Sequence, residues 1–420
     1  MKGEPTTLTL KFPMGLNNRA REHEIPATAL RIINNLSVTN AGGLLCRKGA
    51  RQVLSGSVHS LFDAGQFLLL VVNGVLSKFD GIVATSLVTL KHNAPVRYAI
   101  LNGDTYWTTS FECGRVDVTG AVVPWGIGTP PPIRATATIG ALRPGNYWVT
   151  HTAMLPSGLE SGAPAPVLVS LTTDGGIEVT APSSLGIVFN IYLSSPNGTI
   201  RDLRLATQLL PEFSTVLSSP PRGRLLESLL ATRPVSGQML CSYHGRLWVG
   251  QGAVVWYTSE YSPHWLFPDT GFITVPDRVT LLEASEDGIY VGTNSAVWFL
   301  TGNSPDDMVM RRVSAVGAVE GTGTTLPNDA FSGEGTPPLT RCAWMDTEGY
   351  FCVGYSGGMI VRPTKTAYSA GQHLSGVSGF WQYEGLRQAI VALFDNEIPM
   401  YLSAADTAVH EINQYGITLP

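Results

Sequence analysis

Apolar and polar residues alternate along most of this chain, in short runs that glycine, asparagine, aspartate and proline interrupt. Such alternation, punctuated by turn residues, is typical of β-strands joined by tight turns. Only two stretches, 27–35 and 225–230, have a spacing compatible with a helix. The pattern therefore predicts an all-β protein.

One sequence motif recurs: a turn, a strand of aromatic and small apolar residues, and a second turn. Clear copies lie at 244–250, 286–292 and 347–354, and weaker copies at 63–69 and 102–107. A partner strand follows most copies. Phe67 and Tyr106 are 39 residues apart and Trp248 and Tyr290 are 42, close to the period of a four-stranded propeller blade, whereas Tyr290 and Phe351 are 61 apart. The repeat predicts a β-propeller.

Propeller blades stack radially because a lone hairpin cannot bury both of its faces. Aromatic residues in the repeated strands should then lie between neighbouring blades. We expect this position for Trp107, Trp248, Tyr290 and Phe351. Glycines at the ends of the same strands would allow the sheets to approach closely.

The middle of the chain breaks this period. Short strands with a turn every eight to twelve residues predict a small β-sandwich, and their order resembles a fibronectin type III module. Proline-rich linkers at 128–132 and 218–223 flank it. The predicted organisation is an N-terminal docking segment with the first blades (1–131), the inserted fibronectin III-like sandwich (132–212), and the remaining blades with a C-terminal strand (213–420).

Composition narrows the class of protein. The 420 residues include 45 Gly and 28 Pro, too many for a helical bundle or coiled coil, while 44% hydrophobic residues supply a core. The net charge of −5 gives no basic footprint for a nucleic-acid binder. The apolar run at 67–72 is too short to span a membrane, and we expect neither membrane insertion nor a secretory signal. The Gly- and Thr-rich stretch 317–338 is predicted to be an exposed loop.

The five cysteines are scattered and odd in number, which does not indicate a disulfide framework. They are Cys46, Cys113, Cys241, Cys342 and Cys352. We expect buried free thiols, with a Cys342–Cys352 bridge as the alternative.

The chain lacks the residue patterns of common catalytic and metal sites. Its eight histidines form no HExxH or HxH pair, and CxxC does not occur. GxSxG occurs once, as GYSGG at 354–358, but it stands between two predicted strands and not before a helix, as a nucleophile elbow requires. The stretch 285–290 resembles a sialidase Asp-box but is one residue short and lacks the closing Trp, so Asp287 is expected to be a turn residue. Asp306 and Asp307 are expected in a turn, with a calcium loop as the alternative. No catalytic residue, metal or cofactor is predicted, and we expect no enzymatic activity.

The opening of the chain is more distinctive. It reads GLNNR at 15–19, ALRIINN at 29–35 and GGLLCRKGA at 42–50. Propeller hairpins such as GRLWVG at 245–250 follow, and WQYEGLRQAIV stands at 381–391. In this order the motifs resemble the tail tube and nozzle proteins of short-tailed bacteriophages, over nearly the whole chain outside the sandwich.

The resemblance implies a structural protein of the virion, located in the phage tail and assembled in the cytoplasm of the host bacterium. Such proteins form a homo-oligomeric ring, typically a hexamer, below the portal and its adaptor, the head-to-tail connector. The ring extends the portal channel, retains packaged DNA, lets double-stranded DNA pass without sequence specificity, and carries tail fibres or spikes. A weakly acidic chain is compatible with a channel that must not bind DNA phosphates tightly.

Basic residues gather in the N-terminal segment. They form either a solvated face or an interface with a neighbouring subunit, for which the candidates are Arg19, Arg21, Arg47, Lys48 and Arg51. The tryptophans at 256, 265, 298 and 381 are candidates either for contacts between subunits or for the core. Two other functions stay open: a monomeric propeller that binds a host glycan or receptor, and a glycan-cleaving enzyme with two carboxylates converging at the propeller centre.

Overall fold

The fold is described from a computed structural model of the chain. It describes residues 11–34, 36–39, 41–46, 52–183, 187–327, 341–383, 386–395, 408–413 and 418–419. Regular structure in these ranges is almost entirely β-strand. The exceptions are four short 3₁₀ helices: η1 (Glu22–Glu24), η2 (Ile200–Asp202), η3 (Pro305–Asp307) and η4 (Ser356–Gly358). None of the described residues forms a helix long and apolar enough to cross a membrane.

Neither predicted helix is found in the described part of the chain. Leu30 forms a bridge with Leu16. The segment 225–230 is irregular and ends in a turn, and in it Leu225 bridges Arg204 and Leu229 bridges Ala163. Pairing with distant segments satisfies these backbone groups, which overrides the local helical spacing.

Six four-stranded antiparallel sheets recur among the described residues, and each follows chain order from its first to its fourth strand. We call these sheets blades 1 to 6. Blade 1 consists of β3 (Val58–Asp63), β4 (Leu68–Val72), β5 (Val75–Phe79) and β6 (Ala84–Thr89). Blade 2 consists of β7 (Arg97–Leu101), β8 (Asp104–Thr108), β9 (Cys113–Val116) and β10 (Val122–Val123), and blade 3 consists of β18 (Met239–Tyr243), β19 (Arg246–Gln251), β20 (Val254–Tyr257) and β21 (Phe272–Thr274). Blade 4 is β22 (Val279–Ala284), β23 (Ile289–Thr293), β24 (Val297–Thr301) and β25 (Val309–Ser314); blade 5 is β26 (Thr324–Leu326), β27 (Arg341–Met345), β28 (Phe351–Gly354) and β29 (Ile360–Val361); blade 6 is β30 (Ser375–Tyr383), β31 (Leu386–Phe394), β32 (Ala408–Asn413) and β33 (Thr418–Leu419).

The blades pack face to face through apolar clusters. The four expected aromatic residues lie in these clusters: Trp107 between blades 1 and 2, Trp248 between blades 3 and 4, Tyr290 between blades 4 and 5, and Phe351 between blades 5 and 6. All four side chains are buried, which confirms the prediction. The close approach depends on Gly354, where a Cβ would come within 2.7 Å of Tyr290.

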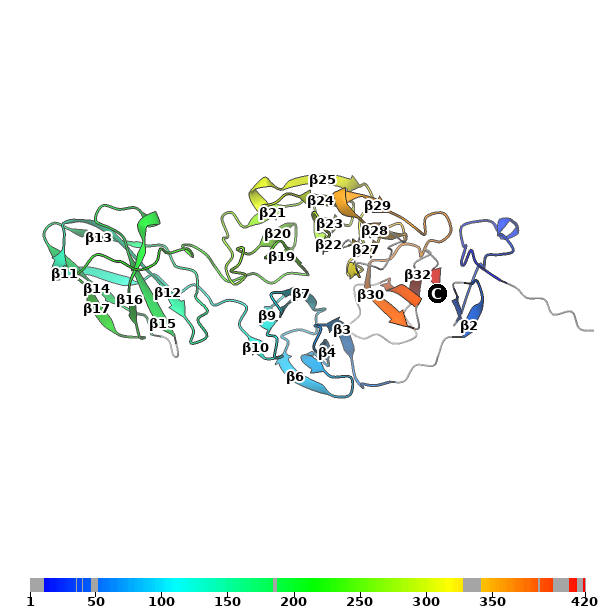
Figure 1. Ribbon diagram of the computed structural model, residues 1–420, viewed down its shortest axis with the longest axis horizontal. Helices are drawn as coiled ribbons and strands as arrows, with labels where there is room; N and C mark the ends of the chain where they lie inside the picture. Colours follow the sequence, from blue (N-terminus) through cyan, green and yellow to red (C-terminus); the bar gives the residue numbers. More distant parts are fainter. Residues whose placement is uncertain are drawn as a thin grey trace, which may run out of the picture.

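The first strands of the six blades, β3, β7, β18, β22, β26 and β30, all line one central cavity. The arrangement is therefore propeller-like, as the repeat predicted (Figure 1). The expectation of an exposed loop at 317–338 is wrong for 317–327, because this stretch contains β26 and buried residues such as Ala318 and Thr322. The remainder of that predicted loop lies outside the described residues.

A two-layered sandwich is inserted between blades 2 and 3. One sheet has the order β11 (Arg134–Leu142), β14 (Gly175–Thr180), β17 (Ser214–Leu217); the other has the order β13 (Val167–Leu171), β12 (Gly145–Met154), β15 (Val188–Leu193), β16 (Arg204–Leu209). Both sheets contribute to one core, which includes Tyr147, Ile177 and Phe189. The sandwich extends through β17, a few residues past the predicted limit at 212.

His151 is an unusual member of the sandwich core. Its side chain is fully buried next to Phe189, and neither ring nitrogen has a hydrogen-bond partner in the described part of the chain. Burial lowers the pKa of His151 from 6.5 to about 4. The folded state therefore favours the neutral imidazole.

The stability of the sandwich should fall as the pH is lowered, because His151 binds a proton in the unfolded chain at a pH where it remains neutral in the folded protein. Below the unfolded pKa of 6.5 this penalty grows, and it levels off near pH 4. From pH 7 to pH 5 we expect wild type to lose about 2 kcal/mol relative to His151→Leu. Urea unfolding of both proteins at the two pH values measures this difference. A constant difference between them would show that His151 does not titrate in this way.

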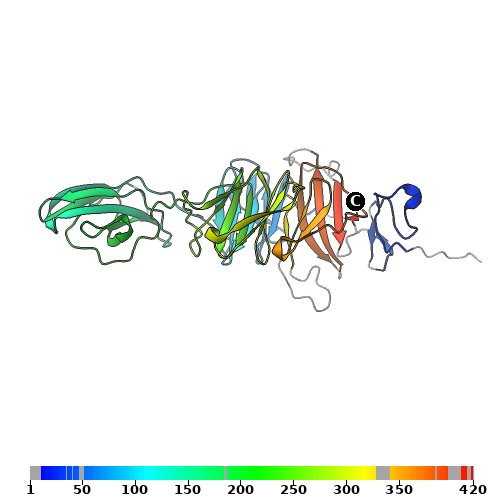
Figure 2. The ribbon, with the colours of Figure 1, turned by 90° about the horizontal axis from the view of Figure 1, so that it is seen from above.

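The N-terminal module, residues 11–46, forms a two-stranded sheet of β1 (Leu36–Val38) and β2 (Leu44–Cys46). It packs on the segment that links blades 5 and 6. Its small core consists of Leu16, Ile33, Val38 and Tyr368. The Asn18 amide donates to the Ser369 carbonyl at 2.9 Å. Two views show the sandwich and this module at opposite ends of the long axis, with the propeller between them (Figures 1 and 2).

Candidate functional site

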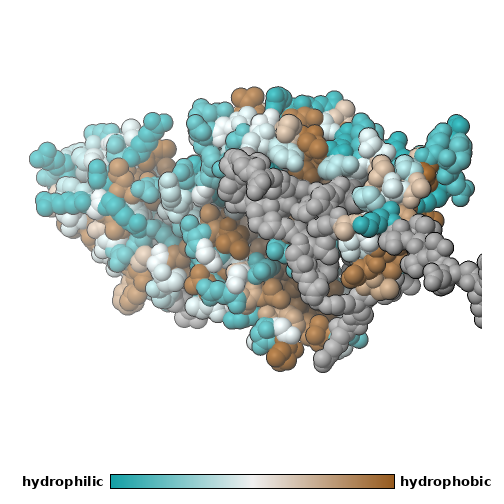
Figure 3. Space-filling model, turned by 45° about the vertical axis from the view of Figure 1, so that its right-hand side comes forward, coloured by the Kyte–Doolittle hydropathy of each residue, from teal (hydrophilic) through white to brown (hydrophobic). Residues whose placement is uncertain are grey.

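The central cavity of the propeller is the first candidate site. It has a volume of about 1180 Å³, and most of its lining is apolar. Phe62 and Tyr98 stack on its wall with ring centroids 4.9 Å apart, while Leu61 and Ile100 expose much of their side chains. Apolar and polar patches interleave on the side of the molecule shown in Figure 3. A concave, mostly apolar cavity with a few polar groups has the character of a ligand pocket.

Two charged side chains with perturbed pKa values line this cavity. Arg97 comes from the start of β7 and Glu283 from the end of β22. The Thr325 hydroxyl donates to Glu283 Oε2 at 3.2 Å. Burial raises the pKa of Glu283 to about 7, although this hydrogen bond and the Arg97 charge oppose the shift. Burial likewise lowers the pKa of Arg97.

A glycan-cleaving mechanism needs two carboxylates with separate tasks. The second carboxylate of the lining, Asp63, is exposed and accepts the Gly65 amide at 2.8 Å in the β3–β4 turn. This bond ties Asp63 to the turn, whereas Glu283 lies deep in the cavity. The arrangement supplies one carboxylate with a perturbed pKa rather than a matched pair.

Ionisation of Glu283 should destabilise the propeller. Because the folded pKa lies above the ordinary 4.5, stability falls as pH rises from 4.5 to about 7 and stays low above that. Glu283→Gln removes the titration. We expect the variant to gain about 2 kcal/mol on wild type between pH 5 and pH 8. Chemical unfolding at both pH values tests this, and parallel pH profiles would contradict it.

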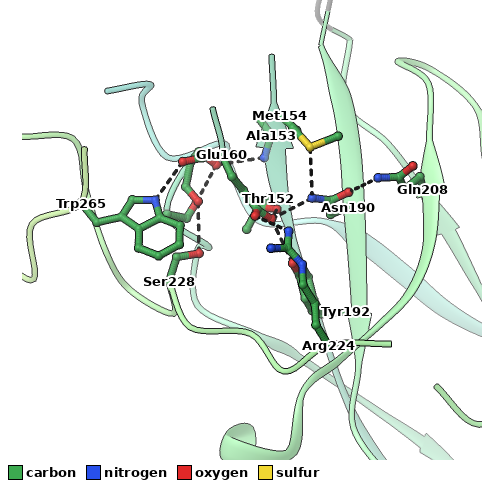
Figure 4. Close-up of polar contacts among 12 residues, drawn as sticks. Thr152, Ala153, Met154, Glu160, Asn190, Tyr192, Gln208, Arg224, Ser228 and Trp265 are labelled. Atoms are coloured by element: carbon green, nitrogen blue, oxygen red, sulfur yellow. Dashed lines mark hydrogen bonds and ion pairs between the residues drawn. The ribbon is translucent and has the colours of Figure 1, made fainter. Parts of the chain in front are cut away.

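The second candidate site is the joint between the sandwich and the propeller (Figure 4). Glu160 Oε1 accepts hydrogen bonds from Thr152 Oγ1, Asn190 Nδ2 (2.8 Å) and Tyr192 Oη (2.9 Å). The other oxygen, Oε2, is 2.5 Å from Arg224. Burial opposes ionisation, but these partners outweigh it and hold the pKa of Glu160 below its usual value. Glu160 is therefore a buried carboxylate with several hydrogen-bond partners, whereas the side chain of its ionic partner Arg224 is 57% exposed.

The backbone around Glu160 connects this network to blade 3. Trp265, from the loop between β20 and β21, donates its indole N–H to the Glu160 carbonyl at 2.8 Å. Ser228, on the return segment from the sandwich, donates to the Ser161 carbonyl at 3.1 Å. At Gly162 a Cβ would lie 1.7 Å from the Ala231 carbonyl oxygen, so no larger residue fits without a shift. The sandwich is thus fixed to the propeller by close, directional contacts.

The predicted interface residues fall in two groups. Arg19 and Arg21 are exposed on the N-terminal module, and the Arg19 guanidinium lies 5.2 Å from the ring centroid of Tyr350. The other three, Arg47, Lys48 and Arg51, lie outside the described residues. The structure thus places two of the five on one module and leaves the interface itself a prediction.

The candidate tryptophans and Asp287 also have defined places in the structure. Trp256, Trp265 and Trp298 are half-buried rather than exposed, and the side chain of Trp381 lies outside the description. Asp287 accepts the Gly357 amide at 2.8 Å, which joins the turns of blades 4 and 5. No group of three or more potential metal ligands occurs among the described residues.

All five cysteines are free thiols, so Cys342 and Cys352 form no bridge. Both are buried, as is Cys241, and burial raises the pKa of all three thiols. The expectation of burial is wrong for Cys46, which is exposed on the edge of the small N-terminal sheet.

Sequence reasoning missed Glu160, Glu283 and Arg97. For Glu160 a signal was present, because it is the only acidic residue between positions 118 and 173. A lone acid in an apolar and Gly/Pro-rich stretch is often buried with a partner. Glu283 and Arg97 stand among charged neighbours in the chain and carry no such signal.

Comparison with known proteins does not identify a family. No family model matches the chain, and no curated protein sequence matches it. Among solved structures, BBS1N in its complex with ARL6DN is 11% identical, with a TM-score of 0.31 over 81% of this chain and 91% of that chain. The AfRom2 CNH domain is 8% identical, with a TM-score of 0.28 over 84% and 93%. PorZ of Porphyromonas gingivalis is 13% identical, with a TM-score of 0.21 over 89% and 57%. These scores are too low to support an inference.

Proposed function

We propose that the chain is a structural protein of a bacteriophage tail, whose copies form a nozzle ring that continues the portal channel. The order of the sequence motifs is the starting point. The structural observation that carries the proposal is the in-line arrangement of three modules, with the sandwich and the N-terminal module projecting from opposite sides of the propeller (Figures 1 and 2). Such a subunit offers a contact surface to a neighbour on each side.

In this proposal the DNA path lies between copies, not inside one propeller. The central cavity, about 1180 Å³, is slightly larger than the ~300–1,000 Å³ of small-molecule pockets and has that scale rather than the scale of a duplex channel. Several copies, with six as the expected number, would have to surround the duplex. Their partners would be the portal adaptor on one side and tail fibres or spikes on the other, in the virion.

We assign the inserted sandwich to the fibronectin III-like class and propose it as the attachment module for fibres or spikes. The four-stranded sheet with the order β13-β12-β15-β16 and the pairing of β11 with β14 support this assignment. The rigid joint around Glu160 suits a module that must transmit load to the ring. No catalytic step is proposed.

The central cavity favours one second candidate function. A monomeric propeller that binds a host glycan or receptor would use a concave site with aromatic walls, and the stacked Phe62 and Tyr98 rings provide such a wall. This candidate predicts a monomer, whereas the nozzle predicts copies that associate.

Light scattering of the purified chain, alone and with tail extracts, tests the proposal. We expect a ring of several copies, or a single copy of 45.0 kDa that enters rings only beside its tail neighbours. A chain that stays monomeric and never enters a virion particle would overturn the nozzle function. Glycan binding by that monomer would then favour the second candidate.

A further inference from the structure

The N-terminal module exposes more apolar surface than its size explains. A two-stranded sheet is marginally stable alone, and this one buries only a small core against Tyr368. On its outside Met14, Ile32 and Leu45 are 55%, 67% and 54% exposed, and Leu44 on the same strand is 41% exposed. Exposed hydrophobic residues concentrated on so small a module are typical of interaction surfaces.

Charge is divided unevenly between this part of the chain and the rest. Residues 1–56 contain eight basic and three acidic side chains, a net charge of +5. The remaining 364 residues contain 19 basic and 29 acidic side chains, a net charge of −10. Arg21 and Arg31 are exposed on the module and have no side-chain ion pair among the described residues. The module itself, residues 11–46, contains four basic and two acidic side chains, a net charge of +2. Its apolar surface is therefore accompanied by a moderate excess of positive charge.

Blades 3 and 4 carry a surface of complementary character. Asp269, Asp306 and Asp307 are exposed in the outer turns of these blades, and no described basic side chain lies within ion-pair distance of them. Tyr257 holds the first turn, since its hydroxyl donates to the Thr270 carbonyl at 2.6 Å. Tyr257 and Met308, which follows Asp307, both pack against the core shared by blades 3 and 4.

Apolar residues accompany this acidic rim, which we define as Asp269, Asp306 and Asp307. Phe272 is 38% exposed three residues after Asp269, and Val309 is 64% exposed two residues after Asp307. The nearby cation Arg246 is already paired with Glu260 at 3.1 Å. The acidic rim thus offers negative charge and apolar side chains that complement the positive charge and the exposed apolar side chains of the N-terminal module.

We propose that the N-terminal module of one copy docks on the acidic rim of a second copy of this chain. The two surfaces lie on different parts of one molecule, with the module at one end and β21 and β25 along a long edge (Figure 1). Such a contact is heterologous, so repeated copies continue head to tail and close when the rotation allows. The inference rests on the proposed ring and names the surfaces that build it. Charge complementarity sets the orientation, and apolar burial supplies the affinity.

A charge exchange tests this contact. Variant A carries Arg21→Glu and Arg31→Glu, and variant B carries Asp306→Lys and Asp307→Lys. Each variant alone brings like charges together and should sediment as a monomer of about 45.0 kDa under conditions where wild type associates. An equimolar mixture restores opposite charges at every contact, so we expect assemblies of wild-type mass. Circular dichroism of each variant checks that the fold is retained.

The matched control places two reversals, Arg201→Glu and Arg222→Glu, on exposed residues of the sandwich and of the linker that follows it, and it should associate as wild type does. Association of variant A or B alone, or a mixture that stays monomeric, would overturn the docking. If wild type is monomeric in solution but enters tail particles, the docking is wrong and the nozzle function survives. If it does neither, the nozzle function fails as well.

Discussion

Replacing Glu160 by alanine is expected to destabilise the sandwich by about 2–4 kcal/mol, because two buried donors lose their acceptor and each costs about 1–3 kcal/mol. The substitution leaves the Arg224 guanidinium without its carboxylate. It also leaves the Asn190 amide and the Tyr192 hydroxyl without an acceptor in a site closed to water. Unsatisfied buried donors cost more than the original hydrogen bonds contributed.

Urea unfolding, together with limited proteolysis of the linker at 218–223, measures this effect. Glu178→Ala is the matched control, because Glu178 is an exposed acid on the same sandwich and should cost less than about 0.5 kcal/mol. Glu160→Gln keeps the size of the side chain and part of its hydrogen bonding, so it should fall between the two. If the Glu160→Ala protein unfolds at the same urea concentration as the Glu178→Ala control, the Glu160 carboxylate is not buried and paired as described.

Most of the architecture could be predicted from local signals. The repeated turn–strand–turn motif predicted the blades, because each blade contains its own turns and its own aromatic residue for the core between blades. Trp248 and Tyr290 mark equivalent core positions. Blade 5 was harder, since β26 (Thr324–Leu326) is short, lies in a Gly- and Thr-rich stretch, and is a strand only because it pairs with β27.

The joint could not be predicted in the same way, because its chemistry is non-local. The partners of Glu160 stand 8, 30, 32 and 64 residues away, and they come from two strands and the return segment. Short-range periodicity contains no information on such contacts. The same holds for the stretch 225–230. Its apolar spacing is compatible with a helix, but its backbone forms bridges with Ala163 and Arg204 instead.

Truncation of Trp344 should reveal how strongly the blades depend on one another. Trp344, on β27, is 1% exposed, and its ring lies 5.3 Å from that of Tyr290 in blade 4. Its indole nitrogen has no hydrogen-bond partner in the described part of the chain, so the change removes packing alone. We expect Trp344→Ala to cost about 3–5 kcal/mol, the range for large aromatic residues in cores.

The matched control is Trp298→Ala, since Trp298 lies on β24 of blade 4 and is half-buried outside the apolar clusters. It should cost about 1 kcal/mol, the typical effect of a point substitution. In a radial stack each blade supports its neighbour, so the loss at Trp344 should lower the stability of the whole propeller in one cooperative transition. Equal costs at the two positions, or a separate early transition for blade 5, would mean that the blades fold independently and that the contact with Tyr290 contributes little.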